Sequence, residues 1–157
     1  MEFSRATSRS AAAQSRRILA IDYGRRRIGL AISDELRLTA TPLETLVRKN
    51  RREDMRRLRE IVRQNSVGFI LVGSPVHIGG EAGEMAEEAA RFAARAGKEL
   101  ALPVALRDER LTSWEAEEIA KETGRRSAKN LDSVAAAILL REHLDEMRNG
   151  TPAAKGK

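Results

Sequence analysis

The sequence predicts an α/β domain in which a mixed central sheet is flanked by helices. Two observations indicate this class. Short apolar runs of strand type alternate along the chain with longer stretches of helical periodicity. Their order, three strands followed by alternating helices and strands and then two final helices, is typical of a mixed sheet with helices on its faces. A chain of 157 residues is long enough for one domain with a hydrophobic core.

The first half of the chain supplies most of the predicted sheet. Two short apolar runs on either side of Gly24 predict a hairpin, and Pro42 places the third run near a sheet edge. The charged stretch that follows carries its apolar residues on one helical stripe. The predicted elements of this half are strands at Ile18–Tyr23, Ile28–Ser33, Leu38–Val47 and Val67–Gly73, with a helix over 51–65.

The second half alternates helices with one further strand. Glu81–Leu100 is alanine-rich and predicts a helix, and Pro103–Glu109 predicts a strand. Thr112–Glu122 predicts a helix because Thr112 and Glu115 have the spacing of a capping box. Leu131–Met147 is the last predicted helix. The segments outside this body are small and polar, so we expect a disordered N-terminal arm over 1–17, a folded domain over 18–148 and a disordered tail over 149–157.

The composition excludes several classes of function. No cysteine is present, which removes disulfides, thiolate metal sites and cysteine nucleophiles and fits a cytoplasmic protein. Aromatic residues make up only 3% of the chain, so stacking platforms for single-stranded nucleic acid are not indicated. No apolar run reaches the roughly 18 residues needed to span a bilayer. We therefore expect neither membrane insertion nor a stacking-based binder.

The positive charge is unevenly distributed. The formal net charge is +6, but residues 1–17 carry +3 and residues 149–157 carry +2, which leaves +1 for the body. Within that body, Arg48–Arg63 contains eight basic and three acidic residues. A basic face on a nearly neutral domain favours phosphate binding, although a solvated helix face would have the same composition.

The stretch "ILAIDYGRRRIGLAISD" suggests a site at the end of a strand. Asp22 is a carboxylate in an apolar run, which is costly unless it is paired or bound to a metal. Gly24 removes a side chain where a phosphate could approach the backbone. Arg25, Arg26 and Arg27 follow in the turn. The alternative is that Asp22 only begins an Asx turn and that the arginines are simply exposed.

Two further segments carry acids that could join Asp22. Asp108 and Glu109 stand at the end of a predicted strand, where α/β sites collect, and strand alternation allows only one of them to face a given site. In the last helix, Asp132 lies about 20° from Leu139 on the helical wheel. The stripe expected to face the core consists of Leu131, Val134, Ala135, Ile138 and Leu139. Helix capping is the alternative role for Asp132.

Three acids from three elements predict a cation site. Clustered carboxylates repel one another unless cations neutralise them, and Mg²⁺ and Mn²⁺ prefer oxygen ligands. A pair of such ions can activate water and stabilise the leaving oxygen of a phosphodiester. The hypothesis from the residues is therefore a site for two Mg²⁺ or Mn²⁺ ions that acts on phosphodiester bonds.

The chain resembles the YqgF (RuvX) family, bacterial proteins described as pre-16S ribosomal RNA nucleases and as Holliday-junction resolvase-like. The matching segments are "AIDYGRRRIGLAISD", "ILVGSPV", "RDERLTS" and "KNLDSVAAAILL", in this order over about 18–145. The resemblance implies a ribonuclease H-like fold and metal-dependent cleavage of nucleic acid. It implies that the catalytic, metal-binding acids are Asp22, Glu109 and Asp132, and that Arg110 and Lys129 contact substrate in addition to the residues of the Asp22 turn.

We therefore expect a cytoplasmic, metal-dependent endonuclease that acts on structured RNA, in the 5′-end maturation of pre-16S ribosomal RNA. The expected partner is precursor ribosomal RNA, with no membrane partner, and the protein is expected to be a monomer or a homodimer. One alternative is a Holliday junction resolvase acting on DNA, and another is a non-catalytic RNA-binding module with the same fold. A phosphotransferase of the actin and sugar-kinase type is disfavoured, because such proteins generally need two domains around ATP.

Overall fold

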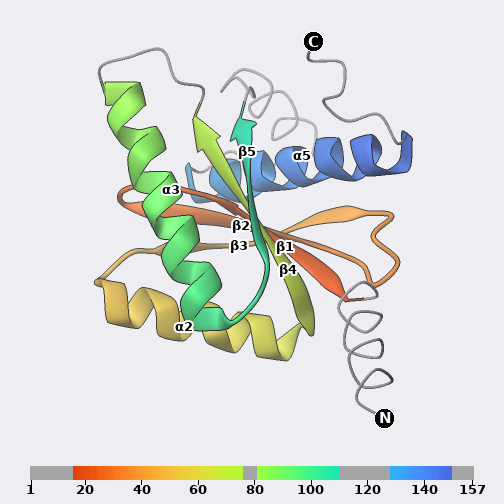
Figure 1. Ribbon diagram of the computed structural model, residues 1–157, viewed down its shortest axis with the longest axis horizontal. Coiled ribbons are helices and arrows are strands. Elements are labelled where there is room, and N and C mark those ends of the chain that lie inside the picture. Colours follow the sequence, from red (N-terminus) through yellow and green to blue (C-terminus); the bar gives the residue numbers. More distant parts are fainter. Residues whose placement is uncertain (1–15, 76–80, 110–127, 150–157) are drawn as a thin grey trace.

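A twisted five-stranded sheet forms the centre of the molecule (Figure 1). The computed structural model describes residues 16–75, 81–109 and 128–149. The strands are β1 (Arg17–Asp22), β2 (Arg27–Ser33), β3 (Ala40–Val47), β4 (Val67–Pro75) and β5 (Val104–Glu109). The helices are α2 (Arg51–Gln64), α3 (Glu81–Leu100) and α5 (Ala128–Asn149). These elements confirm the predicted order, while the predicted helix Thr112–Glu122 and most of both expected arms lie outside the described residues.

The sheet is mixed, with strand order β3-β2-β1-β4-β5. β2 is antiparallel to both β1 and β3, so the hairpin predicted around Gly24 is present. β4 is parallel to β1 and to β5. The strands β1, β4 and β5 therefore have their carboxyl ends at the same edge of the sheet. This edge brings Asp22 and Glu109 to one end of the molecule.

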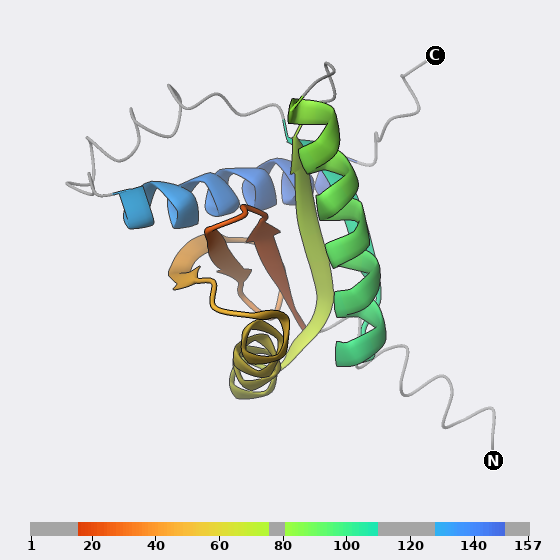
Figure 2. The same cartoon turned by 90° about the vertical axis from the view of Figure 1, so that its left-hand side faces the viewer.

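The two faces of the sheet are covered by different helices. The two views show α5 across one face, and α2 and α3 against the other (Figures 1 and 2). Leu19 and Ile21 of β1 belong to the core on the α2/α3 side, which also contains Leu58 and Phe92. Ile18 and Ala20 of the same strand belong to the core on the α5 side. This alternation assigns every position of β1 to a face.

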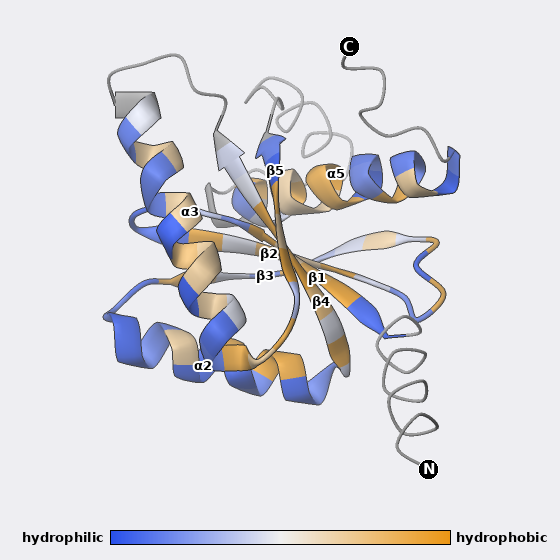
Figure 3. Ribbon diagram, viewed as in Figure 1, coloured by the Kyte–Doolittle hydropathy of each residue, from blue (hydrophilic) through white to orange (hydrophobic). Residues whose placement is uncertain are grey.

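The hydropathy pattern follows this layering. Apolar residues concentrate along the central strands and on the helix sides that face them, and the outer helix surfaces are hydrophilic (Figure 3). In α2, Met55, Leu58 and Ile61 are buried, as the predicted stripe requires. The side chain of Asn50 caps this helix by accepting a hydrogen bond from the backbone N–H of Glu53 at 2.8 Å. None of the helices described for this chain combines the length and apolar character needed to cross a bilayer.

The last helix differs from its prediction in two respects. It begins at Ala128, so Asp132 lies inside the first turns and not at the N-cap, and the capping alternative is wrong. Of the predicted core stripe, Val134, Ile138 and Leu139 are buried, whereas Leu131 and Ala135 are only half-buried. Residues 133–140 are apolar or small on all sides of the helix, so the periodicity could not define one face. The residues that pack against the sheet core are Ala136, Ala137, Leu139, Leu140 and Leu144.

Candidate active site

Asp22 ends β1 on the α5 side of the sheet. It follows Ile18 and Ala20 at alternate positions of the strand, and both of these residues pack beneath α5. Its backbone partners are Gly29 on β2 and Gly73 on β4. Neither of these neighbours has a side chain, so the carboxylate is flanked by glycine on both adjacent strands.

Gly29 also determines where Asp132 lies. A Cβ atom on Gly29 would lie 2.0 Å from the backbone carbonyl oxygen of Asp132 and 2.9 Å from the backbone nitrogen of Ser133. Real Cβ atoms do not approach backbone atoms this closely, so only glycine lets the first turns of α5 rest on β2 at this point. Because Gly29 pairs directly with Asp22, the same contact brings the strand acid and the helix acid to one place.

Arg27 makes an ion pair with Asp132. The Nε–H of Arg27 donates to Oδ2 of Asp132 at 2.6 Å, and the two side chains are 39% and 26% exposed. Arg27 begins β2 two residues before Gly29, so alternation places it on the same face as Gly29 and Asp22. The predicted site therefore contains a guanidinium beside its acids, and this contact was not foreseen from the sequence.

The strand β5 favours Glu109 over Asp108 as the third acid position. Arg107 lies on the α5 side, because its guanidinium pairs with Glu146 of α5 at 2.7 Å. Position 109 is two residues further along the strand and therefore faces the same side of the sheet as Arg107, whereas position 108 faces the opposite side. The structure describes Glu109 and Lys129 through their backbone only, and Arg110 lies outside the described residues.

The three arginines of the β1–β2 turn have separate surroundings. Arg25 pairs with Glu88 of α3, at 3.0 Å from Nε to Oε1 and 2.9 Å from Nη2 to Oε2. This ion pair is the main cause that lowers the pKa of Glu88. Arg27 pairs with Asp132, and Arg26 is exposed and makes no ion pair with any residue that the structure describes. Of the three, Arg26 is thus the guanidinium that a substrate phosphate could reach most directly.

Gly24 has a role inside the turn itself. A Cβ atom at this position would lie 2.4 Å from the carbonyl oxygen of Arg27. The turn between β1 and β2 therefore needs glycine for its own geometry. The prediction that Gly24 serves the approach of a phosphate is not tested by this observation, but such an approach is not required to explain the residue.

Arg48 stabilises the turn between β1 and β2. The sequence pattern predicts it instead as part of a basic face that would bind phosphate. Its Nη1–H donates to the carbonyl oxygen of Gly24 and to the hydroxyl of Tyr23, both at 3.1 Å. Its Nε–H donates to Asp54 at 3.1 Å, and its guanidinium lies 5.2 Å from the centre of the Tyr23 ring and 5.7 Å from that of Phe92. Burial opposes the charge of Arg48, and the bonds to Tyr23 and Asp54 outweigh it, so its pKa is raised.

The basic charge of α2 is partly neutralised within the protein. Arg56 pairs with Glu53 and Glu60, and Arg57 pairs with Glu44. Such exposed pairs hold their guanidinium groups only weakly. The basic side chains of this segment that make no ion pair with the described residues are those of Lys49, Arg51, Arg52 and Arg63.

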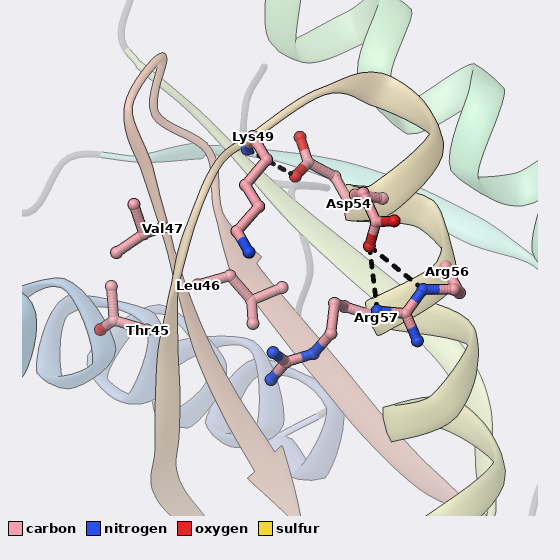
Figure 4. Close-up of a pocket in the computed structure, with 8 residues that line it drawn as sticks. Thr45, Leu46, Val47, Lys49, Asp54, Arg56 and Arg57 are labelled. Carbon is pink, nitrogen blue, oxygen red and sulfur yellow. Dashed lines mark hydrogen bonds and ion pairs between the residues drawn. The ribbon is translucent and has the colours of Figure 1, made fainter.

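A pocket of about 260 Å³ lies where β3 meets α2 (Figure 4). Figure 4 shows Lys49, Leu46 and Arg57 beside one another along it. Val47, which also lines it, is the backbone partner of Arg27, so the pocket lies at the same end of the sheet as the acids. The complete lining is Thr45, Leu46, Val47, Lys49, Glu53, Asp54, Arg56 and Arg57.

The residues at the end of β1 fit a hard divalent cation. The donor atoms that the structure places there are the carboxylate oxygens of Asp22 and Asp132, the ligand type that Mg²⁺ and Mn²⁺ prefer. Arg27 already balances part of their charge. Within the described side chains, no group of three histidines or acids is close enough to hold an ion, and the third predicted acid, Glu109, is described by its backbone alone.

Comparison with solved structures supports the fold. The chain superposes on RuvC of T. thermophilus, in complex with a Holliday junction substrate, with a TM-score of 0.57 and 20% identity over 87% of this chain and 97% of that one. It superposes on the fowlpox virus resolvase with a TM-score of 0.52 and 12% identity over 83% of this chain and 98% of that one. These likenesses, with the mixed sheet, confirm the expected ribonuclease H-like fold.

Sequence comparison identifies much closer relatives. A protein of Koribacter versatilis is 43% identical over 132 residues, which cover 82% of this chain and 86% of the relative. A protein of Geobacillus kaustophilus is 42% identical over 137 residues, or 84% and 99% of the two chains. Both are named "Putative pre-16S rRNA nuclease". The family model described as "RuvX: Holliday junction resolvase" matches residues 16–146. The chain therefore belongs to the RuvX family.

Proposed function

We propose that this protein is a metal-dependent endonuclease that hydrolyses phosphodiester bonds of structured RNA in the cytoplasm, in the 5′-end maturation of pre-16S ribosomal RNA. The observation that carries the proposal is the meeting of Asp22 and Asp132 across Gly29. Two acids from a strand end and a helix form a site whose negative charge calls for cations, and Arg27 balances only part of it. The names of the 40%-identical relatives supply the substrate class.

Asp22, Asp132 and Glu109 would hold the divalent ion, Mg²⁺ or Mn²⁺. When bound, the ion would polarise the phosphodiester and lower the pKa of the attacking water. The chain itself supplies the geometry. Asp22 and Asp132 stand on rigid elements, β1 and α5, and the contact at Gly29 sets how closely α5 approaches the sheet. Rigid placement of ligands is what distinguishes a cation site from a patch of surface acids.

The basic residues around this edge would bind the substrate backbone. Arg26 is exposed next to the acids, and Lys49 lines the neighbouring pocket. Lys129 stands in the first turn of α5, three residues before Asp132. Phosphate contacts of this kind position a nucleic acid without reading its sequence. Arg25 would contribute through Glu88, because that pair holds the turn against α3.

The test is cleavage of a pre-16S leader RNA in Mn²⁺ by Asp22→Asn and Asp132→Asn variants. Each substitution removes a charged ligand and keeps the side-chain volume, so we expect a loss of activity of about 100-fold or more with the fold retained. Asp145→Asn is the matched control, because Asp145 is an exposed acid of the same helix that pairs only with Arg148 among the described residues. Full activity in both site variants would contradict the proposal.

A Holliday junction in DNA is the second candidate substrate. The fold similarity to a junction-bound RuvC and the description of the family model favour it. The same variants should be assayed on a four-way DNA junction and on the RNA leader under identical ionic conditions. Preference for the junction by a wide margin would replace the RNA substrate in the proposal while leaving the acids in their roles.

A further inference from the structure

Arg27 lies where a divalent cation would need the Asp132 carboxylate. Its Nε–H donates to Oδ2 of Asp132 at 2.6 Å, a short, charge-assisted hydrogen bond. The guanidinium is on the same face as Asp22, two residues from the strand partner of that acid. It therefore supplies the positive charge that two neighbouring carboxylates require.

The ion pair between Arg27 and Asp132 can separate without leaving either charge buried. The Arg27 side chain is 39% exposed and that of Asp132 is 26% exposed, so water can solvate both groups when they part. Ion pairs at this level of exposure are worth little: they typically change an equilibrium constant between not at all and about fivefold. Asp132, in contrast, is held by the backbone contact between α5 and Gly29, which does not depend on Arg27.

We propose that Arg27 is a resident cation that competes with the divalent metal for Asp132 and yields the carboxylate when the metal binds. A guanidinium and a divalent ion repel each other and both depend on the single negative charge of Asp132, so the two cannot bind this carboxylate at full strength together. The long side chain of Arg27, once released, remains at the start of β2, at the end of the sheet where the proposed substrate-binding residues lie. This inference rests on the proposed function, because it assumes that Asp132 is a metal ligand.

The competition has a direct thermodynamic test. Mn²⁺ alone is titrated calorimetrically into the wild-type protein, Arg27→Gln and Arg26→Gln. Arg26→Gln is the matched control, since it removes the same charge from the adjacent residue, which has no ion pair with the described part of the chain. We expect Arg27→Gln to bind Mn²⁺ about fivefold more tightly than Arg26→Gln. Equal or weaker binding by Arg27→Gln would overturn the competition.

A second readout follows Arg27 itself. In the wild-type protein, the Nε–Hε resonance of Arg27, identified by its loss in Arg27→Gln, should shift as diamagnetic Mg²⁺ is added, while that of Arg148 should not. A resonance that stays in place at saturating Mg²⁺ would show that Arg27 keeps Asp132 and would overturn the inference. If Arg27→Gln does not fold, Arg27→Met is compared with Arg26→Met, since methionine retains the apolar stem.

The outcomes separate this inference from the proposed function. A wild-type protein that binds no Mn²⁺ contradicts both the metal site and the competition. A wild-type protein that binds Mn²⁺ through Asp132, as shown by loss of binding in Asp132→Asn, but with an affinity independent of Arg27, contradicts only the competition.

Discussion

At the scale of the residue, Gly29 has the strongest influence on the site. It is the strand partner of Asp22 and the contact point for the backbone of Asp132. A hydrogen atom in place of a side chain thus sets the distance between two acids that are 110 residues apart in the numbering. The same residue leaves room around the Asp22 carboxylate, so one small position serves both the packing of α5 and access to the site.

Gly29→Ala should damage stability and the site together. The added methyl group would lie 2.0 Å from the Asp132 carbonyl oxygen, so α5 must move away from β2. We expect a loss of about 1–3 kcal/mol in the free energy of unfolding, the range typical of overpacking. Urea denaturation measures this loss, and Mn²⁺ titration should show weaker binding because Asp132 moves with the helix.

Gly97→Ala is the control for this substitution. A Cβ atom there would lie 2.9 Å from Cγ2 of Val104 and 3.4 Å from the backbone oxygen of Leu102, so Val104 must shift, whereas alanine favours the helix. Its cost in stability should be smaller than that of Gly29→Ala, because no backbone atom outside α3 is closer than 3.4 Å, and its effect on Mn²⁺ binding should be absent. A Gly29→Ala variant that is no less stable than Gly97→Ala would show that α5 does not rest on β2 as described.

At the scale of the element, the ends of two helices carry backbone strain. Ser66 follows α2 and Ala101 follows α3, and both have a positive φ, 54° and 56°. The left-handed conformation normally ends helices at glycine, because a Cβ atom costs energy there. These helices keep their positions through packing on the α2/α3 side of the core, which compensates for unfavourable terminal residues.

Ala101→Gly should therefore stabilise the protein. Removing the Cβ atom from a residue at φ 56° relieves a cost of about 0.5–1 kcal/mol after the entropy of glycine is counted. Differential scanning calorimetry should show a higher Tm. Ala94→Gly is the opposite control: Ala94 is exposed within α3, where the same change should destabilise by about 1 kcal/mol. Equal effects at the two positions would contradict the conformational explanation.

At the scale of the whole molecule, charge is concentrated at one end of the sheet. The body of the chain is almost neutral, yet Arg26, Lys49, Arg51 and Arg52 lie around the turn and the start of α2 and make no ion pairs with the described residues. The acids of the site and these four basic residues therefore lie at the same end of the sheet. This arrangement suits a polyanion whose backbone spans the bases while one phosphate reaches the acids.

The salt dependence of RNA binding measures this arrangement. Arg26→Gln should reduce the slope of log K against log salt concentration by about 1, because one phosphate contact is lost. Arg148→Gln should leave the slope unchanged: Arg148 pairs with Asp145 and lies about 24 Å along α5 from Asp132. Fluorescence anisotropy with a leader RNA at several salt concentrations provides the data. Equal slopes for Arg26→Gln and the wild-type protein would remove Arg26 from the interface.

Local patterns in the sequence are sufficient to predict the class of fold and the candidate acids. Apolar runs of period two and stripes of period 3.6 are local patterns, so strands and helices such as β2 and α3 could be predicted closely. Asp22 and Asp132 stood out for a local reason as well, since each is a carboxylate at the margin of an apolar segment. The face of α5 could be predicted only in part, because residues 133–140 are apolar or small around the whole helix.

The pairing of the charged side chains, in contrast, depends on how the elements pack. Arg25, Arg27 and Arg48 have similar sequence surroundings, yet they pair with Glu88, Asp132 and Asp54 on three different elements. Asp54 lies six residues from Arg48, but the partners of Arg25 and Arg27 lie 63 and 105 residues away and are brought to them by strand register and helix packing. Periodicity specifies which face of an element is buried, whereas an ion pair depends on the distance between two segments after both have packed.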